Sequence, residues 1–191
     1  MRRYIFIILG IILTINTFAQ VAKQGEKFNS VPVIEEKVTF LKEVSLVESM
    51  SADGNYTLLK DWAIENYGKD PFLSSVRHDT KNKEFIAKSR IELLLPANKK
   101  GVREKMVMRY RINGFIFQDR CVLEVTDISY LYENSSKNKL LPRIIRAEDF
   151  ITDNAINIDD EVKEYRENTR KSTLFFLNEL GENFEKHFSN R

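Results

Sequence analysis

The chain has 191 residues, of which 42% are hydrophobic and 30% charged, a composition typical of an ordinary globular protein. Its formal net charge of +2 is due to Arg2 and Arg3, because the other 28 basic residues are matched by 28 acidic ones. A nucleic-acid-binding protein usually carries a surplus of basic residues that neutralises phosphates, so this balance argues against nucleic acid as a partner.

Residues 1–19 have the three parts of a cleavable signal peptide. Two arginines precede an apolar run over residues 5–13, and small residues occupy the third and first positions before the expected cleavage site, which follows Ala19. The apolar run is too short to cross a bilayer comfortably. We therefore expect an exported protein, periplasmic or secreted, with no stable membrane insertion after signal cleavage.

The single cysteine limits how the exported protein is stabilised. Cys121 has no second cysteine with which to form an internal disulfide, and Gln20 offers no thiol for lipid attachment after signal cleavage. The remaining chain is long enough for one domain with a sizeable core. We therefore expect packing alone to stabilise the fold.

The segment after the signal peptide predicts a leader and then a strand. Residues 20–32 are polar and lack periodicity, as expected of a mobile leader. Residues 33–47 alternate with a period of two, which predicts a strand with Val38, Phe40 and Lys42 on one face.

A helix is predicted next. Residues 51–55 offer several capping side chains for free backbone N–H groups. Apolar residues then recur at helical spacing as far as Tyr67. Gly68 and the nearby Pro71 end the helix.

Four strands joined by short turns follow, and such strands pair antiparallel. Their expected ranges are 74–80, 84–95, 102–117 and 121–131. The hairpin between the last two has two possible turns. Asn113 and Gly114 form the strongest short hairpin signal, whereas a turn at Gln118 and Asp119 would leave a bulge at the first position.

The C-terminal third predicts a polar connection and a long helix. Residues 133–157 are expected to be a loop with one short turn of helix near residues 146–150. Asp159 or Asp160 can cap a final amphipathic helix over residues 158–191. The sequence leaves open whether this helix packs on the sheet or projects from it to dock on a partner.

The order of these elements predicts the fold class. Strand, helix, four strands and helix form an α+β domain, with an antiparallel sheet whose apolar face is covered by the helices. We expect residues 33–132 to form the core of this domain.

Three stretches resemble a known family. Residues 38–67 combine a strand with a capped helix that contains Trp62, residues 83–88 form a charged turn into a strand, and residues 117–128 resemble a hairpin leading into an alternating strand. The family is the exported bacterial domain of unknown function with a fold like that of the TATA-box-binding protein. The resemblance implies this TBP-like fold and the periplasm of a Gram-negative bacterium.

The resemblance bears on the hairpin and not on activity. The family has an Asp-Gly-Arg turn, where this chain has Asp119 and Arg120 without the glycine. The match therefore favours the turn at Gln118 and Asp119. Because the family has no established activity, no functional residue carries over, and the name of the fold does not imply DNA binding.

The sequence contains no recognisable catalytic, cofactor-binding or metal-binding motif. His78 and His187 lack the neighbouring ligands that a zinc site requires. Cys121 lies on an alternating strand, where it is expected to face the core rather than act as a nucleophile. The glycine-rich phosphate loops and the nucleophile elbow of hydrolases are also missing from the sequence.

Acidic pairs in the sequence favour structural roles. Glu35 and Glu36 adjoin on the first expected strand, so they should point to opposite faces rather than act together as in glycoside hydrolysis. Asp159 and Asp160 suit the start of a helix, where negative charge is favourable.

One row of side chains is a candidate for ligand contact. Lys105, Arg109 and Arg111 alternate along one strand and face away from its apolar side chains. Phe115 and Phe117 adjoin this row, and exposed aromatics would extend it into a contact patch. The row could contact an acidic ligand, form the solvated face of a sheet, or protect a sheet edge.

These observations favour a non-enzymatic exported binding or interaction module that needs no cofactor. Its partner would be an unidentified protein or a component of the cell envelope. The alternative is a hydrolase of an envelope polymer, which requires two carboxylates about 5–10 Å apart in a cleft assembled by the fold.

Overall fold

The computed structural model describes residues 21–46, 50–132 and 143–189, so the expected signal peptide lies outside the described residues. A seven-stranded sheet has the order β1-β4-β8-β7-β6-β5, and β9 pairs with another part of β8. All of its pairings are antiparallel except that of β1 with β4. The strands are β1 (Val21–Ala22), β4 (Phe40–Ser45), β5 (Ser74–Asp79), β6 (Glu84–Leu94), β7 (Lys105–Ile116), β8 (Arg120–Tyr132) and β9 (Arg143–Arg146).

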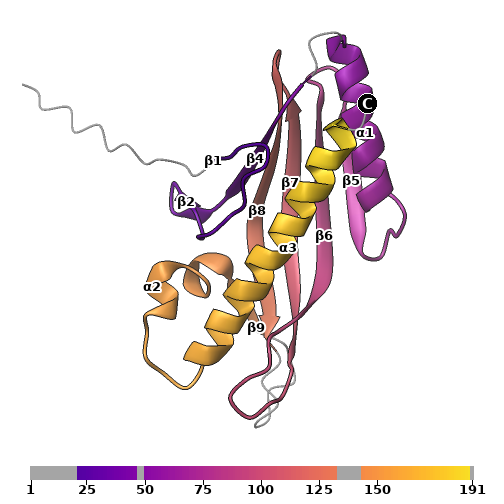
Figure 1. Ribbon diagram of the computed structural model, residues 1–191. Coiled ribbons are helices and arrows are strands. Elements are labelled where there is room, and N and C mark those ends of the chain that lie inside the picture. The colour runs from indigo at the N-terminus through magenta and orange to yellow at the C-terminus, as the bar shows by residue number, and fades with distance from the viewer. Residues whose placement is uncertain (1–20, 47–49, 133–142, 190–191) are drawn as a thin grey trace, which may run out of the picture.

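Two long helices, α1 (Ala52–Tyr67) and α3 (Lys163–Ser189), lie on one face of the sheet, with α3 running diagonally across it (Figure 1). They meet at Trp62, whose ring packs edge-on against Phe184 with 4.9 Å between centroids. The indole Nε1 of Trp62 donates a hydrogen bond of 2.8 Å to Asn183 Oδ1. The final helix therefore packs on the sheet and does not project from it.

The sequence signals of α1 are confirmed. The Ser51 side chain caps the helix by accepting a hydrogen bond of 3.1 Å from the Gly54 N–H, and Gly68 follows the last turn. The apolar stripe faces the sheet, with Leu59 and Ala63 fully buried. Strands β5 to β8 also follow one another in antiparallel order, as expected.

The hairpin between β7 and β8 turns at residues 117–119. The Phe117 N–H donates to the Arg120 carbonyl at 2.8 Å, and Ile116 lies opposite Cys121. The turn at Gln118 and Asp119 is therefore correct. The bulge expected with it was misplaced, because Asn113 and Gly114 pair in regular register within β7 and the register shifts instead between Arg109 and Arg111.

The strand expected over residues 33–47 is instead a tight hairpin followed by β4. Strands β2 (Val33–Ile34) and β3 (Lys37–Val38) pair with each other, and Glu35 and Glu36 form the turn. Both glutamates have positive φ angles, 48° and 64°, as a two-residue hairpin turn demands. The expectation that they point to opposite faces of one strand was wrong, because neither residue is among the Asn, Asp or Gly that signal such turns.

The expected mobile leader is packed against the domain. Residues Val21–Ala22 add a parallel strand beside β4, and Phe28 is buried with its ring edge-on to Phe40 at 5.0 Å. Asn178 of α3 fixes Phe28 from both sides, accepting from its N–H at 2.7 Å and donating to its carbonyl at 3.1 Å. The few apolar residues of this segment are spaced too irregularly to give a periodic signal.

The polar connection contains the short turn of helix expected near residues 146–150, and in addition a strand and a second short helix that were not expected. Residues 133–142 lie outside the described residues, but β9 pairs with β8, and the short helices η1 (Ala147–Asp149) and α2 (Asp153–Ile156) follow. Ala147, Phe150 and Ile151 are buried. The last helix begins at Lys163 rather than near 158, because residues 158–162 form a turn in which Asp160 binds the buried Arg166 at 2.9 Å.

Candidate functional site

The sheet face away from the helices carries a cluster of basic side chains. The even-numbered residues of β6 and the odd-numbered residues of β7 point to this open face, and the residues between them point to the core. The sequence predicted this orientation for Arg109 and Arg111. The strand register places Lys88 directly opposite Arg111, and Arg90 directly opposite Arg109. Like charges opposite each other destabilise a sheet. The fold therefore holds four cations together at a cost in stability.

Three of these four cations lack a carboxylate partner among the described residues. Arg111 binds Asp127 with 3.0 Å between Nη1 and the carboxylate oxygen. Within residues 21–46, 50–132 and 143–189, no ion pair forms at Lys88, Arg90 or Arg109. This "basic cluster" of Lys88, Arg90, Arg109 and Arg111 is thus only partly neutralised.

The carboxylate that Arg111 binds, that of Asp127, stands on a strained bulge. The β7–β8 register shifts between Arg109, which lies opposite Ser129, and Arg111, which lies opposite Thr126. Asp127 is the extra residue and has a φ of 51°. This angle lies in the left-handed region, which residues other than glycine adopt rarely. Such strain persists where the surrounding structure imposes it, and here it directs the carboxylate toward Arg111.

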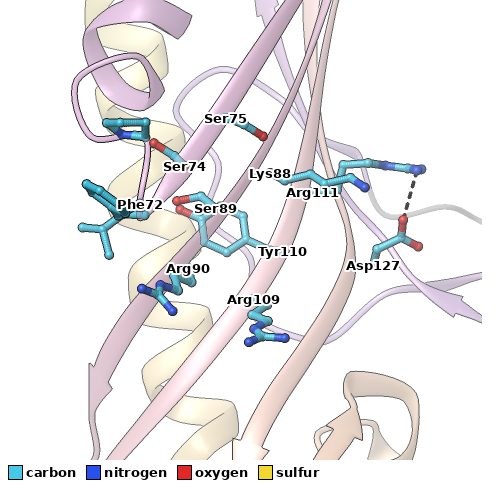
Figure 2. Close-up of a pocket in the computed structure, with 12 residues that line it drawn as sticks. Phe72, Ser74, Ser75, Lys88, Ser89, Arg90, Arg109, Tyr110, Arg111 and Asp127 are labelled. Carbon is cyan, nitrogen blue, oxygen red and sulfur yellow. Dashed lines mark ion pairs between the residues drawn. The ribbon is translucent and has the colours of Figure 1, made fainter.

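The basic cluster lines a cavity of about 460 Å³ on the open face (Figure 2). In Figure 2, α3 lies behind the sheet, and the side chains of Arg90 and Arg109 stand on neighbouring strands. Ser75 and Asp127 also line the cavity. Pro71, Phe72 and Leu73, in the connection between α1 and β5, form another wall together with Ser74 at the start of β5. Ser89 and Tyr110 complete the lining.

The five residues that the sequence proposed for ligand contact do not lie together in the structure. Arg109 and Arg111 line the cavity, whereas Lys105 binds Glu92 at 2.6 Å outside it. Phe115 lies on the open side of β7 and is half-buried. Phe117 is exposed in the turn, where the Arg120 guanidinium lies 5.1 Å from its ring centre. The proposed row is therefore not one continuous contact face.

Sequence reasoning missed Lys88, Arg90, Asp127 and Phe72. Lys88 lies three residues after Phe85 in the strand expected over residues 84–95, so the two side chains should take opposite faces, which is a usable signal for an outward lysine. The register that brings two strands' cations together has no local signal. Nor does the bulge at Asp127.

The other candidates for chemistry lie apart from this cavity. Cys121 faces the core, and burial raises the pKa of its thiol well above the usual value, which opposes nucleophilic reactivity. In the described part of the chain, no three His, Cys, Asp or Glu side chains gather as metal ligands would. None of the helices described there is long and apolar enough to cross a membrane.

His78 on β5 should make stability depend on pH. Both ring nitrogens are buried without a hydrogen-bond partner among the described residues, and burial, followed by the Lys60 ammonium, lowers the pKa of this imidazole. The unfolded chain then binds the proton more readily, so stability falls as the pH drops below the unfolded pKa of about 6.5. Between pH 7.5 and 5.5, the midpoint of thermal unfolding should fall less in His78→Gln than in the wild type. In Lys60→Gln the fall in this midpoint should lie between those of the other two proteins. If the midpoint depends equally on pH in the wild type and both variants, His78 is not the group responsible.

Comparison with known proteins places the fold in a family. Residues 41–131 match the family described as "Domain of unknown function (DUF4468) with TBP-like fold". Over these residues the chain is similar to the DUF4468 family. The resemblance inferred from the sequence and the expected α+β class are confirmed. No curated protein matches the sequence.

Two solved structures share the architecture. A TBP-like protein from Parabacteroides distasonis ATCC 8503 has a TM-score of 0.67 and 24% identity, with 83% of this chain and 97% of that one covered. A DUF4468 family protein from Bacteroides ovatus ATCC 8483 has a TM-score of 0.67 and 17% identity, with 85% of this chain and 92% of that one covered. At such identities the likeness establishes the fold alone.

Proposed function

We propose that this protein is an exported, non-enzymatic binding module that takes an anionic ligand in the open-face cavity. The observation that carries the proposal is the juxtaposition of Lys88, Arg90 and Arg109 without carboxylate partners among the described residues. An anion placed between them would relieve their mutual repulsion. Arginine also binds carboxylate and phosphate groups through paired hydrogen bonds.

Export is supported by the pattern of residues 1–19. The hydrolase alternative has less support. It needs two carboxylates about 5–10 Å apart, one of which acts as the acid. Asp127 is the carboxylate that lines the cavity, and Arg111 already binds it. No second carboxylate lines the cavity among the described residues, so the pair that this mechanism requires is not found there.

The proposal can be tested with protein purified from the periplasm of a bacterial host. Its intact mass should correspond to residues 20–191. Titration with sodium sulfate at constant ionic strength, followed by backbone amide NMR shifts, should show saturable binding centred on β6 and β7. The double variant Arg90→Gln/Arg109→Gln should weaken binding at least tenfold, because a hydrogen bond to a charged group contributes about 1.5–3 kcal/mol.

Lys60→Gln is the matched control, since Lys60 is an exposed cation on α1, which covers the opposite face. It should leave sulfate binding unchanged. Because Lys60→Gln removes one charge and the double variant two, a loss of binding free energy in Lys60→Gln of half that in the double variant, or more, would mean that sulfate responds only to net charge, and the proposal of a specific site would fail.

A further inference from the structure

The cavity that holds the basic cluster has a second wall of a different chemical kind. Pro71, Phe72 and Leu73 line it beside the cations. The Phe72 side chain is 86% exposed and Leu73 is 48% exposed, so both present apolar surface to solvent. Figure 2 shows Phe72 on one side of the cavity, with Arg90 on the adjoining strand.

Hydrogen bonds fix the backbone of this apolar segment. Asp70 accepts from the Phe72 N–H through its carboxylate at 2.9 Å and from the Leu73 N–H through its carbonyl at 3.2 Å. The Ser74 hydroxyl donates to the Tyr67 carbonyl at 2.7 Å, which ties the segment to the end of α1. Phe72 therefore stays exposed at the cavity because the backbone around it is anchored.

The same anchoring ties the apolar wall to the cationic wall. The Arg90 N–H donates to the Leu73 carbonyl at 3.0 Å, so the strand that supplies a guanidinium also sets the position of the apolar segment. A ligand bound there meets positive charge at one end and an aromatic surface at the other. The volume of about 460 Å³ lies within the range of small-molecule pockets.

We propose that the ligand is a small organic anion with an apolar body, such as a medium-chain or aromatic carboxylate. This inference rests on the proposed function and narrows it. The carboxylate contacts Arg90 and Arg109, and the apolar body covers Phe72 and Leu73. Binding then buries the exposed aromatic surface, which an inorganic anion leaves in water.

The test is a series of linear carboxylates, from acetate through butyrate and hexanoate to octanoate, titrated into the wild-type protein at constant ionic strength. Each methylene that becomes buried should strengthen binding by about two- to fourfold. Phe72→Ser should flatten this dependence on chain length. Because Phe72 is so exposed, the substitution should not affect folding.

Two controls separate this site from other apolar surfaces. Phe175→Ser removes an exposed phenylalanine of α3 that lines a different groove, beside β6, and should leave the chain-length dependence intact. Glucuronate carries the same charge on a hydroxylated ring and should bind no better than acetate.

The outcomes distinguish this inference from the proposed function. If acetate and octanoate bind equally and both require Arg90 and Arg109, the site takes small anions without regard to their body, and the inference fails while the proposed function stands. If Phe175→Ser rather than Phe72→Ser flattens the series, or if glucuronate binds most tightly, the inference is wrong. If neither arginine affects any of these anions, both proposals fail.

Discussion

Replacing Glu185 with alanine should lower the free energy of unfolding by about 3–5 kcal/mol, the usual result of removing one partner of a buried ion pair. Lys42 is only 4% exposed, although it lies on β4 among core side chains. Its Nζ lies 2.5 Å from a carboxylate oxygen of Glu185 on α3. Without that carboxylate, a buried ammonium would keep only neutral partners.

The loss should extend to the N-terminal segment. Lys42 Nζ also donates to the carbonyls of Lys23 and Glu26, at 3.0 and 2.6 Å, and the Gly25 N–H donates to Glu185 at 2.7 Å. These contacts join the segment after β1 to both β4 and α3. We therefore expect Glu185→Ala to increase hydrogen exchange in residues 21–28 as well as to lower the midpoint of urea unfolding.

Two further variants identify the cause of this loss. Glu182→Ala removes an exposed pair with Lys27, one turn earlier on the same helix, and should change the free energy of unfolding far less, because solvent screens an exposed ion pair. The double variant Lys42→Met/Glu185→Leu replaces both charges with apolar groups and should recover most of the stability. A double variant as unstable as Glu185→Ala would show that the charge left unpaired is not the cause.

The elements that could be predicted from the sequence are those with local signals. Helix α1 has a capping serine, an apolar stripe and a terminal glycine within one short segment. Strands β4 and β7 alternate clearly enough to place Lys42 and Arg109 on the correct faces. Each of these signals arises from residues adjacent in the chain, so no knowledge of tertiary contacts is needed.

The elements that could not be predicted depend on distant partners. Strand β1 exists because it can pair with β4 and because α3 fixes Phe28 through Asn178. The basic cluster depends on the β6–β7 register, and Asp127 reaches it through a bulge that adds one residue to β8. Alternation predicts which face a side chain takes but not which side chain of the next strand lies opposite.

Gly114→Ala should destabilise the protein by about 1–3 kcal/mol, toward the upper end for a substitution that overpacks a core. Gly114 lies opposite Phe85 in the β6–β7 register, and the Phe85 ring covers the space where a side chain would stand. A β-carbon at this position would lie 2.2 Å from Cε1 of Phe85 and 3.1 Å from Cδ1 of Leu59. Phe85 cannot move aside easily, because it is buried and packs against Trp62 at 6.0 Å.

Gly181→Ala is the matched control for this prediction. The same methyl group on α3 would meet its nearest neighbour, the Lys42 side chain, at an ordinary 3.5 Å. Because alanine favours the helix by up to about 1 kcal/mol over glycine, this variant should be as stable as the wild type or more stable. In the Gly114→Ala background, Phe85→Leu should restore part of the loss, since shortening the ring removes the clash and makes the two substitutions non-additive. Urea unfolding measures all four proteins, and a Gly114→Ala variant as stable as the wild type would show that the core adjusts freely beneath β7.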